Sequence, residues 1–334
     1  MREAEWREYV EAATREIGYS PGWTRLLEQT FGYRRHHLFA IDSGGAVTGF
    51  LPLFHVRSRI TGDRLCAAPF TPYCGPLGSD EARTALLSAA CQAREDLGIA
   101  SLEIHDRADH GGFQTFNWYS TYLLDLTAGP ESLRKQRFSK NIQRGISQAE
   151  KMGLEVVRSR GPEDLAAFSR MNLRHKKNLG VLGHPRRFFE NLFSHLPGVA
   201  TLYLARLDGE ILAGCIFLRF RDHTLYGYGA STPSSRDTPA MKGILWQGIR
   251  DACTSGGLSF DFGRVSYSNE GLIRFKRSWG AEERKLYYSY SPAPSGNMFH
   301  HRDTLVYRLV NAAVRAMPFP LFSRLSDRYF GIFG

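Results

Sequence analysis

Residues 37–53, HLFAIDSGGAVTGFLPL, align without a gap with residues 202–218, LYLARLDGEILAGCIFL. The alignment places Gly49 on Gly214, so its offset is 214 − 49 = 165 residues. Each stretch consists of two apolar runs around a glycine-containing turn, which is the pattern of a β-hairpin. A repeat with such a long period predicts two copies of one domain, because the units of a solenoid are only about 20–50 residues long.

A second match lies farther along both copies. Residues 98–104, GIASLEI, align with residues 256–262, GGLSFDF, at an offset of 256 − 98 = 158 residues. This match places Glu103 on Asp261. The two offsets differ by 165 − 158 = 7 residues, which one loop insertion explains. We therefore predict two similar domains in tandem.

Apolar periodicity and turn residues predict the same order of elements in both copies. The first copy is predicted to contain helices near 4–16 and 21–31, strands at 36–42, 46–57 and 63–67, a helix at 80–96 and a strand at 100–105. The second is predicted to contain a strand at 121–125, a basic helix at 135–151, a strand at 154–158, helices at 162–178 and 185–195, strands at 201–207, 211–220 and 223–230, a helix at 238–255 and a strand at 259–262. This order predicts an α+β fold with a mixed sheet.

The composition predicts a soluble, cytoplasmic globular protein, with 43% hydrophobic and 23% charged residues. The five cysteines are scattered without a CxxC pair, which is typical of reduced thiols. The first 18 residues are polar and acidic, and no run of about 18 apolar residues could span a bilayer. A net charge of +10 favours polyanionic partners such as RNA, nucleotide diphosphates or acidic lipids, although a protein without such a partner can also be basic.

Charged and aromatic residues gather at residues 258–280, LSFDFGRVSYSNEGLIRFKRSWG. A predicted buried strand ends at Asp261-Phe262-Gly263-Arg264, and a short segment after a polar loop presents Phe275, Lys276 and Trp279. The end of a core strand is a usual place for a binding site in such architectures.

This segment resembles the signature of the FemAB/FemX-like family, which comprises peptidoglycan bridge-forming aminoacyltransferases and related acyltransferases. The matching pieces are Asp261-Phe262-Gly263-Arg264, Glu270-Gly271 and Phe275-Lys276-Arg277-Ser278-Trp279-Gly280, with further support from the 208–214 hairpin, the basic helix and Pro72–Leu77. The resemblance covers most of residues 35–290. It implies two tandem GNAT-like domains, at residues 1–128 and 129–292, followed by a helical tail at 297–334.

The resemblance implies an acyl-CoA or aminoacyl-tRNA donor, no tightly bound cofactor, and an amine acceptor on a cell-envelope or exopolysaccharide precursor. The chain lacks the coiled-coil arm of the bridge-forming members, which weakens the case for tRNA. It also lacks the Q/R-x-x-G-x-G/A loop of acetyl-CoA enzymes. The nearest candidate is residues 236–243, where Pro239 replaces the first glycine and Arg236 opens the segment. The donor stays open at this point.

In this family the acceptor amine attacks the donor carbonyl directly, so the enzyme must hold the donor and stabilise the oxyanion. The resemblance makes Lys276 the first candidate for that stabilisation, while Phe275 and Trp279 would line the channel. Simple core packing of the two aromatic residues is an equally good expectation. Asp261 is a candidate to orient the nucleophile or act as a base, although fixing the end of a strand is the more common role of such a carboxylate.

The remaining candidates are residues that could bind substrate. Lys140, Arg144 and Arg264 could hold a phosphate, or could simply lie on a solvated basic face. Tyr226 and Tyr228 alternate with glycines, which predicts that both rings lie on one face of a strand beside open backbone.

The tail carries apolar residues at helical spacing with arginines between them. Such a tail could lie on an acidic membrane surface at the inner face of the plasma membrane, or dock on the protein itself. Metal binding is not favoured, because His105, Asp106 and His110 have no evident further ligands. A non-catalytic binding module for RNA or an anionic glycan is the rival to the transferase hypothesis.

Overall fold

The computed structural model describes the chain except residues 1–2, 59–61, 160, 293–304 and 334, so part of the predicted linker and of the tail lies outside the described residues. The chain forms two compact units. Unit 1 comprises residues 1–119, 285–303 and 329–334, and unit 2 comprises residues 120–284 and 304–328.

The units are interleaved in sequence, unlike the consecutive domains predicted at 1–128 and 129–292. Two long strands cause the difference. Strand β8 (Gln114–Asp125) begins in unit 1 and ends in unit 2, and β15 (Glu282–Ser291) begins in unit 2 and pairs with β7 (Ser101–Asp106) of unit 1. Strand periodicity alone carries no signal that a strand crosses from one core to another.

Unit 1 contains two sheets. The first has the strand order β1-β4-β5-β7-β15, and the second has the order β2-β3-β6. The remaining elements are α1 (Glu3–Ala13), η1 (Ile17–Tyr19), α2 (Pro21–Phe31), β1 (Arg34–Arg35), β2 (Leu38–Ile41), β3 (Val47–Leu51), β4 (Leu53–Val56), β5 (Arg64–Ala67), β6 (Leu77–Gly78), α3 (Asp80–Asp96) and η4 (Phe330–Phe333). The single strand predicted at 46–57 is two strands in different sheets, separated at Pro52, whose nitrogen cannot donate to a ladder.

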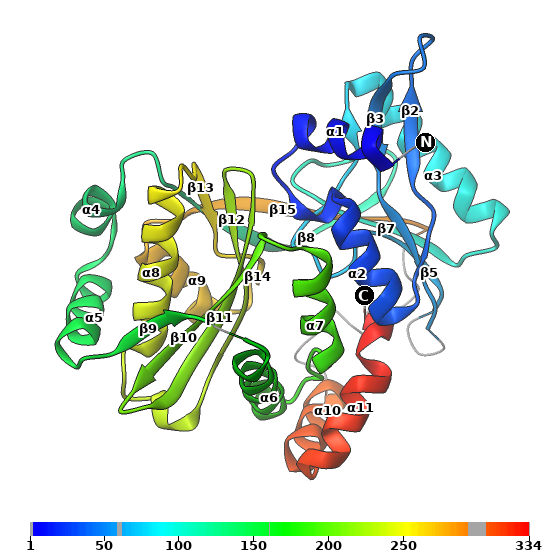
Figure 1. Cartoon of the computed structure of the whole chain (residues 1–334). Coiled ribbons are helices and arrows are strands. Elements are labelled where there is room, and N and C mark those ends of the chain that lie inside the picture. Colours follow the sequence, from blue (N-terminus) through cyan, green and yellow to red (C-terminus); the bar gives the residue numbers. More distant parts are fainter. Residues whose placement is uncertain (1–2, 59–61, 160, 293–304, 334) are drawn as a thin grey trace. The chain divides into compact units, whose positions relative to one another are not determined.

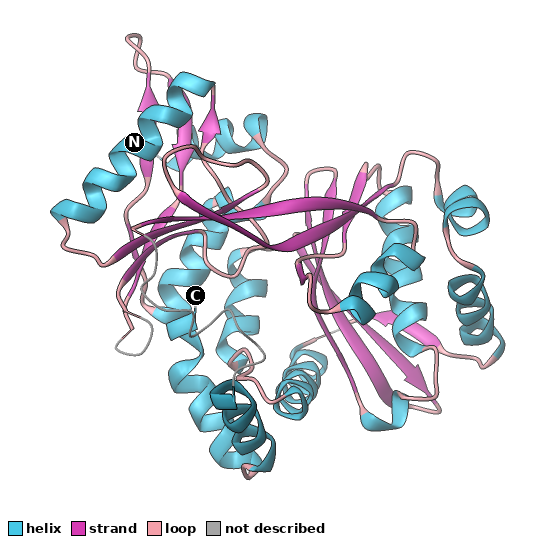
Figure 2. Cartoon of the chain, turned by 180° about the vertical axis from the view of Figure 1, so that it is seen from behind, coloured by secondary structure: helices cyan, strands magenta, loops and turns pink. Residues whose placement is uncertain are grey.

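Unit 2 is one sheet with the strand order β8-β13-β12-β11-β10-β9 and helices on both faces (Figure 2). Its strands are β9 (Glu155–Arg158), β10 (Ala200–Leu207), β11 (Glu210–Phe220), β12 (His223–Ser231), β13 (Ser259–Asp261) and β14 (Val265–Ser266), which pairs with β8. Its helices are α4 (Pro130–Ser132), η2 (Leu133–Arg137), α5 (Lys140–Lys151), α6 (Pro162–Leu179), α7 (Arg186–His195), η3 (Pro233–Ser235), α8 (Ala240–Thr254), α9 (Glu270–Ser278), α10 (Leu305–Ala316) and α11 (Phe319–Tyr329), whose last residue falls in unit 1.

Helices α5 and α8 cover one face of this sheet, and α6 and α7 cover the other (Figure 1). Alternating side chains of β11 explain the two layers. Phe217 packs into the core cluster with α5 and α8. Gly214 faces the other side, where a side chain would collide with α6: a Cβ there would lie 2.8 Å from the ring of Phe168. The core therefore forms on both sides of β11.

The basic helix predicted at 135–151 is broken near its start. Phe138 has extended backbone, and Ser139 caps a new helix, with its side chain accepting a hydrogen bond from the backbone N–H of Ile142. A serine that accepts from the N–H three residues later is a favourable helix start. The helix that carries Lys140 and Arg144 is therefore α5 alone.

The structure confirms the sequence repeat at the level of the hairpins. In both copies a β-bulge follows the matched alanine, Ala40 in the β2–β3 hairpin and Ala205 in the β10–β11 hairpin. Asp208 and Gly209 both have positive φ, as a two-residue hairpin turn requires. Later in each copy a parallel pairing of three residues ends at the matched acids, Glu103 and Asp261. The predicted α+β fold with two similar copies is thus confirmed.

The tail docks on unit 2 through α10 and α11. Val314 and Phe322 are buried with Leu173 of α6 in one small core. No helix in the described residues has the length and hydropathy needed to cross a membrane.

Candidate active site

The candidate site lies where β12 and β13 separate. The two strands pair in parallel from His223 to Leu225 on β12 and from Ser259 to Asp261 on β13. Beyond these residues β12 stays paired with β11, whereas the chain after Asp261 stays with β8, since the Phe262 N–H donates to the Tyr122 carbonyl over 2.9 Å. The separation leaves the end of β12 and the chain after Asp261 without a ladder between them, which is where a ligand could enter between core strands.

The matched position in unit 1 is closed. There β5 and β7 pair as far as Cys66 and Glu103, but Cys74 then bridges to His105, and its N–H donates to the His105 carbonyl over 2.6 Å. No bridge of this kind is found among the described residues of unit 2. Only the unit 2 copy therefore keeps the opening between its parallel strands.

Lys276 of α9 reaches this opening from below the strands. Its side chain is buried, with 2% exposed, and Nζ donates a hydrogen bond to the Gly263 carbonyl. Burial is the main cause that lowers its pKa from 10.5 to about 8; the charge of Asp261 opposes this shift, and the charge of Arg264 contributes to it. Nζ also lies 5.8 Å from the ring centre of Tyr122. A buried ammonium group with a lowered pKa at a strand opening is typical of a functional site.

Asp261 is fully buried and fixes the end of β13. One oxygen, Oδ1, accepts hydrogen bonds from the Gly263 N–H over 2.7 Å and from the Thr121 hydroxyl. This arrangement fits the expectation of a carboxylate that ties a strand end, and it also holds a negative charge near Lys276. Glu103 differs, because its partners are side chains that include Arg64, His105, Tyr290 and Cys66.

The aromatic residues of the segment have different environments. Trp279 is fully buried and packs against Phe138, with ring centres 5.0 Å apart, and against Phe262 at 6.0 Å. Phe275 is only half-buried, 6.3 Å from Trp279. Trp279 is thus placed as core packing, while Phe275 keeps a face available. Arg264 is exposed beside the opening.

The spacing of Tyr226 and Tyr228 predicts that both lie on one face of β12, but this prediction is wrong: they lie on opposite faces. A β-bulge at Gly227 pairs Tyr228 with Ile216 and Tyr226 with Phe217, and these two neighbours on β11 point to opposite faces. The ring of Tyr226 accordingly packs near Phe217 on the α8 side. Tyr228 packs on the other side, against His184, Phe188 and Phe189.

Gly229 has a specific role beside Tyr226. A Cβ at this position would lie 2.1 Å from the Tyr226 hydroxyl, which crosses over the strand towards Met241. We expect Gly229→Ala to destabilise the protein by about 1–3 kcal/mol through overpacking. The Tyr226→Phe background should reduce that cost, because it removes the colliding oxygen. Urea unfolding of the four proteins of this double-mutant cycle measures the effect, and an equal cost in both backgrounds would contradict it.

Arg236 precedes α8, whose first turn has no side-chain cap. Arg236 is exposed, and Lys242 in the first turn reaches towards α5, with Nζ 3.4 Å from Asn141 Oδ1. The start of α5 and the start of α8 therefore lie together. The Ser139 N–H also donates to the Ser278 carbonyl over 2.8 Å. The C-terminal end of α9, the helix that carries Lys276, therefore lies beside the start of α5. Helix starts favour negative ligands.

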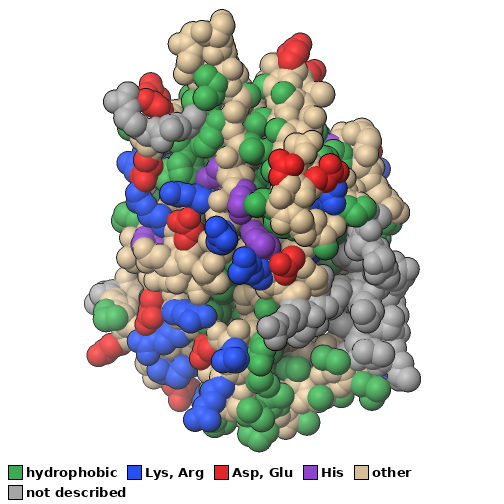
Figure 3. All heavy atoms as spheres, turned by 90° about the vertical axis from the view of Figure 1, so that its right-hand side faces the viewer, with side chains coloured by type: hydrophobic (Ala, Val, Ile, Leu, Met, Phe, Trp, Pro, Cys, Tyr) green, Lys and Arg blue, Asp and Glu red, His purple; other side chains and the backbone are tan. Residues whose placement is uncertain are grey.

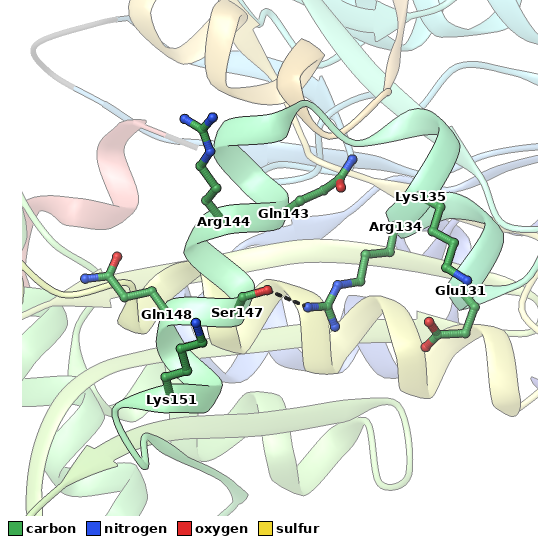
Figure 4. A pocket seen from close by; sticks show the side chains of 8 residues that line it. All are labelled: Glu131, Arg134, Lys135, Gln143, Arg144, Ser147, Gln148 and Lys151. Carbon is green, nitrogen blue, oxygen red and sulfur yellow. Dashed lines mark hydrogen bonds between the residues drawn. The ribbon is translucent and has the colours of Figure 1, made fainter.

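Arg144 lines a hollow of about 670 Å³ on the outer side of α5 (Figure 4). Arg134 is held there by Ser147 and by Glu150, at 2.9–3.1 Å, whereas Arg144 and Lys151 form no hydrogen bond with other described residues. Figure 4 shows Arg144 projecting away from Arg134. Lys140 is exposed in the first turn of α5 and is not part of the hollow.

Sequence reasoning missed Thr121 and the Gly263 carbonyl, the two groups that hold Asp261 and Lys276. Neither has a motif, because the first is one hydroxyl on a long strand and the second is backbone. The available signal was Gly263, two residues after Asp261. Its φ of 74° favours glycine, and this turn directs its N–H to Asp261 and its carbonyl to Lys276.

Residues 135–277 match the model of the acetyltransferase (GNAT) domain. This part of the chain is similar to GNAT acetyltransferase domains. It contains the strand opening, Asp261 and Lys276, and it confirms the prediction of an acyl or aminoacyl transferase.

The fold of the whole chain is similar to FemX, with a TM-score of 0.70 and 16% identity over 93% of this chain and 98% of that one. It is also similar to the C-terminal domain of a protein described as a lysylphosphatidylglycerol synthetase from Agrobacterium fabrum (TM-score 0.61, 16% identity, 87% and 93% covered). A tandem GNAT protein from the clavulanic acid biosynthesis pathway has a TM-score of 0.51 and 15% identity, with 88% and 94% covered. No curated protein sequence matches the chain. The FemX-like tandem arrangement is therefore confirmed as a fold.

Proposed function

We propose that the GNAT domain transfers an acyl or aminoacyl group from an activated donor to an amine of a cell-envelope precursor. The observation that carries the proposal is Lys276, an ammonium group buried at the point where β12 and β13 separate. The closed opening in unit 1 supports unit 2 as the catalytic unit.

Lys276 would stabilise the charge that develops on the donor carbonyl. Nζ has three N–H groups, of which one donates to the Gly263 carbonyl, so two can reach an oxyanion. The acceptor nitrogen forms a bond to the carbonyl carbon, the C–S or C–O bond to the donor breaks, and the amine proton leaves with the departing group. At pH 7 a pKa of about 8 keeps Lys276 mostly protonated, as this role requires.

The donor would bind through its phosphates. The starts of α5 and α8 together present Lys140, Lys242 and Arg236, and Arg144 adds a charge on the next turn of α5. Such a surface fits either the phosphates of an acyl-CoA or those of a tRNA acceptor stem. The family model favours an acyl-CoA donor, whereas the likeness to FemX favours aminoacyl-tRNA as the alternative. In both cases the donor is a co-substrate.

The acceptor is proposed to be part of a peptidoglycan or lipid-linked precursor at the inner face of the plasma membrane. The folds of FemX and of the lysylphosphatidylglycerol synthetase domain support a cell-envelope acceptor. No observation favours an exopolysaccharide.

Thermal unfolding tests the proposal with acetyl-CoA, longer acyl-CoAs and charged tRNA, because a ligand of the folded state raises the Tm. We expect one of these donors to raise the Tm of the wild type and of Lys276→Met, since the substitution removes chemistry more than binding. Transfer to a panel of amines should then be fast with the wild type and strongly slowed in Lys276→Met. Steeply salt-dependent RNA binding without turnover would instead establish the non-catalytic binding module.

A further inference from the structure

A second hollow of about 530 Å³ lies between α6, the end of β12 and the turn between α10 and α11. We call it the α6–tail pocket. All of its lining residues belong to unit 2. It borders Ser231, the last residue of β12, which lines the candidate site, and the following Thr232. A concave site of this size on the same strand is large enough for a small molecule.

The rim of the α6–tail pocket is cationic. Arg170 and Arg174 lie one turn apart on α6 and are both exposed. Neither forms an ion pair or hydrogen bond with another described residue, and Arg174 lies 5.4 Å from the ring centre of Phe319. No aspartate or glutamate lines the pocket. Two arginines without carboxylate partners favour a phosphate group.

The floor of the pocket is apolar. Met171, Ile211, Met317 and Phe319 line it below the two arginines. Met171 is 7% exposed, so its side chain belongs to the protein interior. A phosphate alone would leave these side chains facing water, whereas a hydrocarbon chain attached to the phosphate would cover them.

The adjoining surface of the tail has the same character. Leu309, Val310 and Leu321 are 61%, 54% and 49% exposed. Figure 3 shows hydrophobic side chains gathered over α10 and α11, next to basic ones. The described tail carries four arginines and a single acid: Arg308, Arg315, Arg324, Arg328 and Asp327. Exposed apolar residues among arginines complement an acidic lipid surface.

We propose that the α6–tail pocket binds the phosphate end of an anionic lipid, with the phosphate on Arg170 and Arg174 and the first part of the hydrocarbon chain against Met171, Ile211 and Phe319. The inference deepens the proposed function, on which its last step rests: it names a lipid-linked phosphate as the class of the acceptor. The binding itself stands on the pocket alone.

The test is binding of monomeric dihexanoyl phosphatidic acid, measured by calorimetry on the full chain. The double variant Arg170→Ser/Arg174→Ser should lose affinity by roughly tenfold or more, because each arginine supplies a charge-assisted hydrogen bond. The matched control is Arg186→Ser/Arg274→Ser, which removes two exposed arginines of unit 2 outside the pocket and should bind like the wild type. Equal affinity of the two double variants would overturn the site.

Two further probes identify the source of the phosphate. Inorganic phosphate should bind the wild type more weakly than the amphiphile, and Ile211→Ser should weaken the amphiphile but not the phosphate. If both probes bind equally and Ile211→Ser changes neither, the pocket holds a free anion and the lipid is excluded. Dihexanoyl phosphatidylcholine should bind poorly, because its headgroup carries a cation.

A failed pocket can be distinguished from a failed transferase. Lys276→Met should bind dihexanoyl phosphatidic acid like the wild type, because Lys276 is not part of the pocket. Transfer to a soluble amine without amphiphile binding would reject the lipid site and keep the transferase. Amphiphile binding that depends on Arg170 and Arg174, without transfer to any amine, would keep the lipid site and reject the transferase.

Discussion

Replacing Lys276 with methionine is expected to slow transfer strongly and to stabilise the protein at the same time. Removal of one preorganised donor to an oxyanion typically costs about 10²–10³ in rate. The stability gain follows from burial, since lowering the pKa from 10.5 to about 8 means that the charged form costs roughly 3 kcal/mol in the folded state. Loss of the hydrogen bond to Gly263 offsets about 1 kcal/mol of this gain.

The gain should depend on pH in a defined direction. Between pH of about 8 and 10.5 the unfolded wild type binds a proton at Lys276 that the folded protein has lost, so wild-type stability rises with pH across this window. The advantage of Lys276→Met should thus be largest below pH 8 and should disappear before pH 10.5, because the lost hydrogen bond still counts against the variant. Urea unfolding at several pH values measures it, with the exposed Lys285→Met as control. A variant that is less stable than the wild type at pH 7 would show that Lys276 is structural.

Trp279→Ala is expected to cost about 3–5 kcal/mol of unfolding free energy, as is typical for a large buried aromatic residue. Trp279 fills the space between Phe138 and Phe262 and ends α9 just before Gly280, whose φ is 72°. Its loss would release the helix that carries Lys276, so activity should fall together with stability.

Trp279→Phe separates packing from recognition. The indole Nε1 has no hydrogen-bond partner among the described residues, so phenylalanine loses volume but no hydrogen bond. We expect it to be only mildly destabilised and active. Phe275→Ala, at a half-buried position, should cost less than Trp279→Ala. A Trp279→Ala protein of wild-type stability but without activity would instead make Trp279 a wall of the donor channel.

Local signals in the sequence predict much of this fold. The hairpin with Asp208 and Gly209 and the repeat that places Glu103 on Asp261 follow from glycine turns and apolar patterns, and the structure contains both. The bulge at Gly227 also had a signal, since glycine inside a strand often marks a bulge, and it reverses the face of Tyr226 relative to Tyr228.

The candidate site depends on contacts that no local pattern encodes. The distance in sequence between Thr121 and Asp261 is 140 residues, and their hydrogen bond exists because β8 pairs with β13. The closure of the unit 1 opening by Cys74 likewise arises from a loop that folds back on β7. Such long-range pairings distinguish the unit 2 copy from the unit 1 copy, although the two copies share one sequence pattern.

The pH dependence of the transfer rate tests the central claim most directly, once a donor is identified. A cationic Lys276 that stabilises the oxyanion predicts that the ratio of the wild-type rate to the Lys276→Met rate is highest below pH of about 8 and falls above it with a single ionisation. The ratio is used because the acceptor amine loses its proton equally in both proteins. A ratio that rises through pH 8 would contradict the account, because it would make neutral Lys276 a base.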